Sequence, residues 1–166
     1  MITVEKVNVP AIPLIRELAM KVWPQTYSSI LTREQVDYML EMIYSEASLQ
    51  EQISEKGHQF VIAYDDKEPV AFASYSPLTE GDSRIFRLHK IYILPGQQGK
   101  GIGKKMLDDI SADIIPLGAE ILELNVNRYN PAKSFYEKIG FAVFREEDID
   151  IGNGYFMNDY VMRKKL

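Results

Sequence analysis

Hydrophobic and polar positions alternate with a strand-like period at the start of the chain and then change to a helical one. Residues 2–7 alternate as a half-buried strand does, and from residue 11 to 22 the apolar side chains recur three or four positions apart. Pro24 is expected to end this helix, because a proline disfavours the helical conformation in the residue before it. Residues 32–35 (Thr-Arg-Glu-Gln) form a capping box that predicts a second helix, and a short third helix is expected over residues 47–55.

After Gly57 the pattern favours strands, with two helices between them. The predicted strands are residues 59–64, 69–75, 85–94, 121–126, 141–148 and 155–163, and the predicted helices start near residue 101 and cover 131–139. This order predicts an α+β domain with some α/β character, in which a mixed sheet includes two strand–helix units in its second half. No repeat, low-complexity tract or linker divides the chain, so residues 1–166 are expected to form a single domain.

Composition narrows the class of protein. The chain has 166 residues, 46% of them hydrophobic, and no cysteine, which excludes disulfides, thiolate metal sites and a cysteine nucleophile. The net charge of −5 argues against broad nucleic-acid binding. No apolar run is as long as a membrane span, and the first residues lack a signal-peptide core. We therefore expect a cytoplasmic protein without a membrane or nucleic-acid partner, and no metal site, since no His, Asp and Glu residues have metal-ligand spacing.

The segment most suggestive of chemistry covers residues 88–103, where a predicted strand runs into a glycine-rich turn that opens a helix. Gly99, Gly101 and Gly103 remove side chains where the backbone must turn sharply or approach a ligand. The free N–H groups at a helix start, together with the helix dipole, form an anion site suited to a pyrophosphate. Three lysines add positive charge around it: Lys100, Lys104 and Lys105.

Two well-known phosphate loops do not fit this segment. A nucleoside-triphosphatase loop requires glycine at Gln98 and Ser or Thr at Lys105, and a dinucleotide fingerprint requires glycine at Lys104 or Met106. What remains is the pattern Gln-x-x-Gly-x-Gly over residues 98–103. A glycine-rich turn without a ligand stays open as the alternative.

A second segment, residues 125–141, narrows the interpretation of the glycine-rich segment. Asn130 suits a helix N-cap, Pro131 the first helical position, and Gly140 a left-handed helix end before Phe141 re-enters the core. Together with the Gln98–Gly103 loop, this segment resembles the two motifs of the GCN5-related N-acetyltransferase (GNAT) superfamily. The resemblance covers about the last half of the chain.

Membership of that superfamily would imply a mixed, mostly antiparallel sheet of six or seven strands. Four or five helices would flank the sheet, which would splay between the strands at 85–94 and 120–126. It would also imply acetyl-coenzyme A as the acyl donor, with the Ile93 N–H polarising the thioester carbonyl. The residues that the resemblance implies for donor binding are Ile91, Tyr92, Ile93, Gln98, Gly99, Lys100, Gly101, Ile102, Gly103, Lys104, Asn125, Asn130 and Lys138. Tyr136 would act as the general acid that protonates the leaving thiolate, and Phe135 would face the core.

The acceptor is less well defined by the sequence. The resemblance implies a primary amine of a small molecule that attacks the thioester directly, and polyamine-like amines are one candidate class. A non-catalytic coenzyme A-binding module, a peptide or protein N-acetyltransferase and a longer-chain acyltransferase remain open. Some aromatic residues of the first half either line the acceptor site or belong to the core: Trp23, Tyr27, Tyr38 and Tyr75. No general base is identified, since His58 is interpreted as structural and His89 as a solvent-facing strand residue, and a homodimer is compatible with the sequence.

Overall fold

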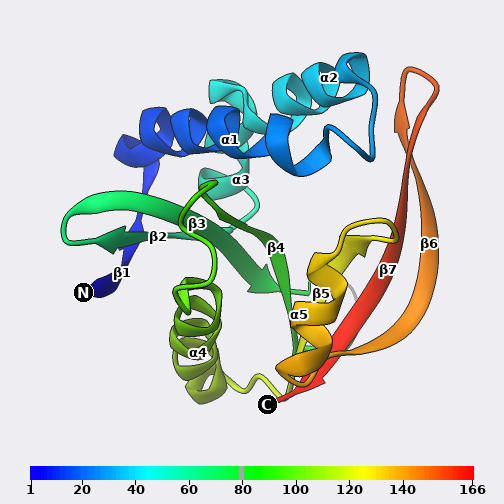
Figure 1. Cartoon of the computed structure of the whole chain (residues 1–166). Coiled ribbons are helices and arrows are strands. Elements are labelled where there is room, and N and C mark those ends of the chain that lie inside the picture. Colours follow the sequence, from blue (N-terminus) through cyan, green and yellow to red (C-terminus); the bar gives the residue numbers. More distant parts are fainter. Residues whose placement is uncertain (79–80) are drawn as a thin grey trace. The chain divides into compact units, whose positions relative to one another are not determined.

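The computed structural model describes residues 1–78 and 81–166, and these form two compact units. The first unit consists of Met1–Ser76 and Lys90–Ile110, and the second of Pro77–His89 and Ser111–Leu166. Figure 1 labels their elements in chain order. These are β1 (Ile2–Val7), η1 (Val9–Ala11), α1 (Ile12–Tyr27), α2 (Arg33–Tyr44), α3 (Glu46–Ser54), β2 (Gln59–Asp65), β3 (Glu68–Pro77), β4 (Ile85–Ile93), α4 (Ile102–Ile114), η2 (Ile115–Leu117), β5 (Ile121–Asn127), α5 (Ala132–Lys138), β6 (Ala142–Gly152) and β7 (Tyr155–Lys165).

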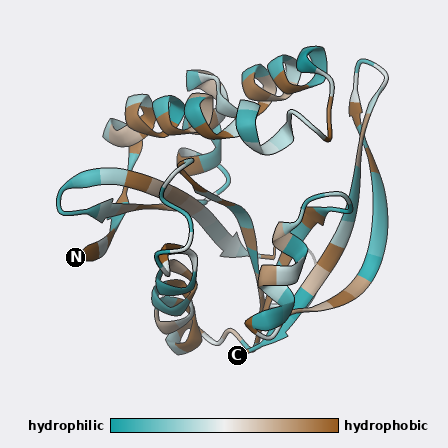
Figure 2. Cartoon of the chain, viewed as in Figure 1, coloured by the Kyte–Doolittle hydropathy of each residue, from teal (hydrophilic) through white to brown (hydrophobic). Residues whose placement is uncertain are grey.

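The first unit is built on an antiparallel meander. β1 pairs with β2, and β2 pairs with β3 through a tight turn at Asp66 and Lys67, both of which have positive φ. The Leu94 N–H donates to the Val70 carbonyl over 2.8 Å, which fixes the end of β4 beside β3. Figure 1 shows α1 and α2 on one side of β2 and β3 and α4 on the other. The alternation of hydrophobic and hydrophilic residues along α1 in Figure 2 matches a helix with one buried face.

The first helix is longer than the sequence predicts. Pro24 was expected to end it, but α1 continues through Pro24 to Tyr27. Proline removes one backbone donor and leaves the rest of the turn able to form, and Pro24 itself is exposed. Trp23 and Tyr27, on either side of it, are only 2% and 5% exposed. Burial of these two aromatic side chains therefore outweighs the local cost of the proline.

The other two helix starts of this unit agree with the sequence. The Thr32 hydroxyl accepts a hydrogen bond from the Gln35 N–H over 3.2 Å, as the capping box predicts. The Ser45 hydroxyl accepts in the same way from the Ser48 N–H and begins α3 directly after α2. These caps set the directions of both helices.

The second unit contains the parallel pair of the sheet. Ile85–Leu88 of β4 pair in parallel with Ile121–Leu124 of β5, and α4 with η2 forms the crossover between these strands. β7 then pairs antiparallel with β5 on one side and with β6 on the other. β6 therefore forms the outer edge of this part of the sheet, and Figure 2 shows it mainly hydrophilic.

The predicted fold class is confirmed. Over residues 1–78 and 81–166 the structure has five α-helices and seven strands, hydrogen-bonded in the order β1-β2-β3-β4-β5-β7-β6. The single domain stays a prediction. Within the described part of the chain, no helix is long and apolar enough to span a membrane.

Candidate active site

The glycine-rich turn lies in the first unit, between β4 and α4. A turn follows β4, in which the Gln97 N–H donates to the Leu94 carbonyl over 3.1 Å. Gly99 and Gly101 then have φ of +81° and +76°, a conformation that other residues adopt only with strain. A Cβ built at either position meets no atom within 4 Å. The glycines are thus required by the backbone, and a ligand can approach the chain closely on their open side.

The start of α4 supplies the donors that an anion needs. The first N–H groups of a helix have no acceptor within it, and the Lys105 N–H is the one that donates to the Gly101 carbonyl, over 3.0 Å. Gly103 lies in the first turn of this helix, with its backbone buried, and has no positive φ. These N–H groups and the open glycine turn fit a pyrophosphate.

The lysines of the turn are exposed and paired with acidic or amide groups. Lys100 donates to the Gln97 side chain over 2.8 Å, and Lys104 donates to Asp108 over 2.8 Å, one helical turn further along α4. Exposed pairs of this kind are weak, worth at most about 1 kcal/mol. A bound phosphate can therefore compete with these partners for the ammonium groups.

The strand that precedes the turn contributes backbone rather than side chains. Ile91, Tyr92 and Ile93 are half-buried at the end of β4. The Tyr92 hydroxyl lies 2.9 Å from the Tyr27 hydroxyl, so this side chain belongs to the packing of the first unit. Its predicted role in donor binding therefore involves the main chain. Ile102, at the start of α4, is 1% exposed and anchors the helix in the core.

The aromatic residues of the first half form a packed cluster. The ring centroids of Trp23 and Tyr27 are 4.5 Å apart, those of Trp23 and Tyr92 are 5.7 Å apart, and the indole N–H donates to the Tyr44 hydroxyl over 3.1 Å. Tyr75 is also buried, at 3% exposure. The core interpretation is therefore correct for Trp23, Tyr27 and Tyr75.

Lys90 is a buried charged residue of β4 that sequence reasoning missed. It is 9% exposed, and its ammonium group donates to the Gln52 side-chain oxygen over 2.6 Å. The rings of Phe60 and Tyr44 lie 5.5 and 5.9 Å from its nitrogen. Burial, with a smaller effect of Lys56, lowers the pKa of Lys90 to about 7. The sequence did contain a signal for this burial, because Lys90 lies two residues from both Leu88 and Tyr92 and so shares their face of β4.

The neighbouring His58 agrees with its structural interpretation. It is half-buried at the entrance to β2. Burial, followed by the charges of Lys90 and Lys56, lowers the pKa of His58 to about 4. The imidazole is therefore neutral near pH 7, where it adds no charge to the buried region around Lys90.

In the second unit, two asparagines order the turn from β5 into α5. The Asn127 side-chain oxygen accepts from the Tyr129 N–H, and that of Asn130 accepts from the Ala132 N–H, each over 2.9 Å. Asn130 thereby supplies a hydrogen bond at the helix start, as a capping residue would, but α5 begins at Ala132, so Pro131 lies at the N-cap and not at the predicted first helical position. Gly140 follows the helix with φ of +107°. Lys138, also expected at the donor site, lies exposed in the last turn of α5.

Tyr136 and its neighbour are arranged differently from the expectation. Tyr136 is buried, at 8% exposure, and its ring lies 5.8 Å from that of Phe141. Phe135, predicted to be core, is 38% exposed, so that prediction is wrong. Adjacent residues of a helix cannot both face the same packed surface, and here the tyrosine ring occupies it. Burial of a tyrosine in place of a phenylalanine is consistent with a role for its hydroxyl.

A polar network crosses the second unit and includes Asn125. Arg87 donates to Glu123 over 2.9 Å and to the Asn125 side-chain oxygen over 2.6 Å. The Asn125 side-chain nitrogen then lies 3.3 Å from a Glu147 oxygen and 3.2 Å from an Asp159 oxygen. The Asn125 side chain is thus held by protein partners, and Asp159 is a buried carboxylate that sequence reasoning did not single out.

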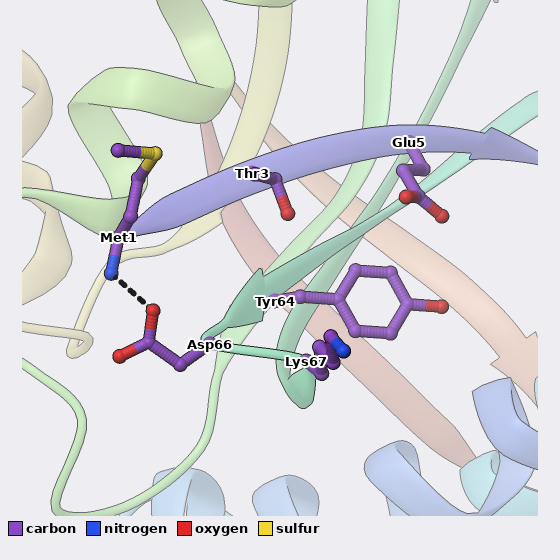
Figure 3. A pocket seen from close by; sticks show the side chains of 6 residues that line it. All are labelled: Met1, Thr3, Glu5, Tyr64, Asp66 and Lys67. Atoms are coloured by element: carbon purple, nitrogen blue, oxygen red, sulfur yellow. Dashed lines mark hydrogen bonds and ion pairs between the residues drawn. The ribbon is translucent and has the colours of Figure 1, made fainter.

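A separate cavity of about 470 Å³ lies in the first unit (Figure 3). It is lined by residues at the start of the chain and in β1, in β2, and in the turn between β2 and β3: Met1, Thr3, Glu5, Tyr64, Asp66 and Lys67. The Met1 amino group donates to Asp66 over 2.7 Å across it. None of the predicted site residues lines this cavity, so it is distinct from the glycine-rich turn.

Comparison with known proteins identifies the family. A family model described as "Acetyltransferase (GNAT) domain" matches residues 28–163. The chain belongs to this family. An uncharacterised N-acetyltransferase of Mycobacterium tuberculosis is 28% identical over 150 residues, which are 90% of this chain and 94% of that protein. The predicted superfamily is therefore confirmed, and the chain is an acetyltransferase that uses acetyl-coenzyme A as its acyl donor.

Other similar proteins differ in what their names say about the acceptor. The [Ribosomal protein bS18]-alanine N-acetyltransferase of Haemophilus influenzae is 38% identical over 69 residues, or 42% of this chain and 44% of that protein. The crystal structure of the PaiA N-acetyltransferase of Thermoplasma acidophilum in complex with coenzyme A has a TM-score of 0.82 and 26% identity. This match covers 100% of this chain and 99% of that one. Both names describe acetyl transfer to nitrogen, and together they leave the acceptor of this chain undefined.

Proposed function

We propose that this GNAT protein transfers the acetyl group of acetyl-coenzyme A to a primary amine of a small, cationic, polyamine-like molecule. The main support is the turn at Gly99 and Gly101, whose open backbone and helix start suit the donor pyrophosphate. The net charge of −5 is compatible with a cationic acceptor. The likeness to a ribosomal-protein acetyltransferase covers less than half of this chain, which gives a protein acceptor less support.

In this proposal the first unit binds the donor. The backbone N–H groups of residues 98–104 would hold the pyrophosphate, with Lys100 and Lys104 adding charge. Main-chain groups of Ile91, Tyr92 and Ile93 would hydrogen-bond the pantetheine arm. The Ile93 N–H would polarise the thioester carbonyl, a contribution of roughly 10²–10³-fold in rate for a single donor. Asn125, Asn130 and Lys138 are proposed as further contacts.

Tyr136 is the proposed general acid. When the amine attacks the thioester carbon, the sulfur leaves as a thiolate, and a phenol with a pKa near 10 can donate a proton to it. The sequence contains no cysteine, so an acetyl-cysteine intermediate cannot form. This agrees with direct attack of the amine on the thioester.

The setting of the reaction is also part of the proposal. We expect it to take place in the cytoplasm, with no nucleic acid or membrane as a partner. The exposed edge strand β6 offers a surface on which a second copy of the chain could pair. Fractionation and analytical ultracentrifugation would measure the compartment and the oligomeric state.

An acceptor panel tests the proposed function. The release of coenzyme A thiol is followed with polyamines, amino acids, aminoglycosides, and peptides with free amino termini. The proposal predicts the highest kcat/KM for a small polyamine-like amine. Selective turnover of peptides would contradict it, and binding of acetyl-coenzyme A without turnover of any acceptor would indicate a non-catalytic module. The same assay with succinyl and longer donors tests whether acetyl is preferred.

A further inference from the structure

Asp159 of β7 is a buried carboxylate, and one of its oxygens accepts no hydrogen bond from the described residues. It is 6% exposed, and its Oδ2 atom accepts from the Asn125 side-chain nitrogen over 3.2 Å. Its Oδ1 atom is shielded from water and has no hydrogen-bond donor among the described residues. Leaving a buried acceptor without a donor costs folding free energy, so such atoms often mark a place where a ligand binds.

The position of this carboxylate is fixed by the sheet. Asp159 lies directly opposite Asn127 in the antiparallel β5–β7 pair, and Asn125 is the diagonal neighbour on the same face. Arg87 donates to the Asn125 side-chain oxygen over 2.6 Å, which turns the Asn125 nitrogen toward Asp159. This hydrogen bond to Oδ2 fixes the orientation of the Asp159 carboxylate, and with it the direction in which the Oδ1 atom points.

The other acidic residues of the network are already satisfied. Glu123 is 2% exposed and accepts from Arg87 over 2.9 Å and from Arg163 over 3.0 Å. Glu147 accepts from Arg145 at one oxygen and from Asn125 at the other. Among the described members of this network, Asp159 is the carboxylate that can still accept from a ligand.

Burial makes Asp159 a better base than an ordinary aspartate. Burial is the largest influence and raises the pKa of Asp159; Glu147 on β6 raises it too. The Asn125 hydrogen bond, Arg87 on β4 and Arg128 after β5 lower it, but less. A carboxylate with a raised pKa accepts a proton more readily from a bound ammonium group.

We propose that the Oδ1 atom of Asp159 binds the ammonium group of the acceptor and takes the proton that the nitrogen must lose before it attacks. The inference rests on the proposed transfer to an amine. The ammonium N–H bond breaks, its electron pair stays on nitrogen, and Asp159 becomes the neutral acid. The C–N bond then forms as the C–S bond breaks. Tyr136 protonates the leaving sulfur and becomes a phenolate, which takes the nitrogen's second proton, and Asp159 returns its own proton to solvent.

The matched variants Asp159→Asn and Glu147→Gln test this role. Each removes one negative charge from the same network, and the asparagine oxygen can still accept from Asn125. With the best amine of the panel, kcat/KM of Asp159→Asn should fall roughly 10²–10³-fold, as for loss of a positioned base. Glu147→Gln should stay within about threefold, in the range of a substitution outside the reacting groups. Wild-type activity retained by Asp159→Asn would overturn the inference.

The pH profile separates a base from a structural group. Wild-type kcat/KM should fall on the acid side, where Asp159 becomes protonated, and Glu147→Gln should keep this limb. Asp159→Asn should lack it, and a limb unchanged in that variant would contradict the proposed proton transfer. Because a buried carboxylate with a raised pKa destabilises the fold when charged, Asp159→Asn should unfold at a temperature no lower than the wild type at pH 7. A wild-type profile without an acid limb would also overturn the inference, even if the variant failed to fold.

Amine binding distinguishes failure of this inference from failure of the proposed function. Calorimetric titration of a primary polyamine into the coenzyme A complex should give binding for the wild type and at least tenfold weaker binding for Asp159→Asn. Asp159-dependent binding without turnover of any amine would refute the transfer reaction and leave the amine site in place. Equal binding by the two proteins would overturn the amine site.

Discussion

The two compact units differ in the part of the chain that forms their functional groups. In the first unit the candidate donor site consists of main-chain groups at a glycine turn and a helix start. In the second unit the candidate groups are side chains, the buried phenol of Tyr136 and the buried carboxylate of Asp159. A backbone site tolerates changes in charge but not in φ, whereas a side-chain site depends on single atoms. The following predictions use this difference.

The largest effect is expected in the second unit. Tyr136→Phe removes one hydroxyl, and kcat should fall roughly 10²–10⁴-fold, since a positioned general acid is lost. Steady-state kinetics with the best amine measure this change. Tyr129→Phe is the matched control, because Tyr129 is 72% exposed just before α5, and it should keep wild-type kcat. An unchanged kcat and pH profile in Tyr136→Phe would refute the acid assignment.

Donor binding at the glycine turn of the first unit should depend on the positive φ of its glycines. Gly101→Ala strains a residue at φ of +76° and places a methyl group on its open side, so the KM for acetyl-coenzyme A should rise on the order of 10–100-fold. Gly118→Ala is the control, since Gly118 has φ of +99° and equally open surroundings in the second unit. Both variants should lose similar stability, of about 1–2 kcal/mol. Equal KM values for the two variants would show that the turn does not bind the donor.

Lys90 is the first unit's counterpart of Asp159, but Gln52 already accepts from it, so it should affect stability rather than catalysis. Its pKa of about 7 lies below the ordinary value of 10.5, so the unfolded state binds more protons between these pH values. Wild-type stability should therefore rise with pH over this window.

Replacement by an apolar side chain should remove this cost. Lys90→Met is expected to raise the free energy of unfolding by about 1–4 kcal/mol at pH 7, and the gain should shrink toward pH 10. Urea denaturation at several pH values measures it. Lys21→Met, at an exposed position of α1, should change stability by less than about 0.5 kcal/mol. Destabilisation by Lys90→Met at pH 7 would contradict the burial cost.

The smallest effect is expected for the exposed lysines. Lys104→Gln should weaken acetyl-coenzyme A binding about two- to fivefold at low salt, and the difference should disappear near 0.5 M salt because exposed charges are screened. Lys165→Gln, an exposed lysine of β7, should bind like the wild type. Salt-independent loss in Lys104→Gln would indicate a structural role for this side chain.

The same contrast explains what the sequence could predict. Glycine spacing at residues 98–103 and the Asn130–Gly140 helix are local patterns, so the turn, the caps and the order of elements followed from short segments. Asp159 is brought beside Asn125 by the register of β5 and β7, which no short segment encodes. Pro24 and Phe135 were misassigned for a related reason, since long-range packing of Trp23, Tyr27 and Tyr136 decided both.

Calorimetric titration of acetyl-coenzyme A into Tyr136→Phe and Gly101→Ala most directly tests the division between a backbone donor site and side-chain proton chemistry. The account predicts wild-type affinity for Tyr136→Phe, although its kcat is strongly reduced, and affinity at least tenfold weaker for Gly101→Ala. Wild-type affinity in Gly101→Ala, or loss of donor binding in Tyr136→Phe, would contradict the account.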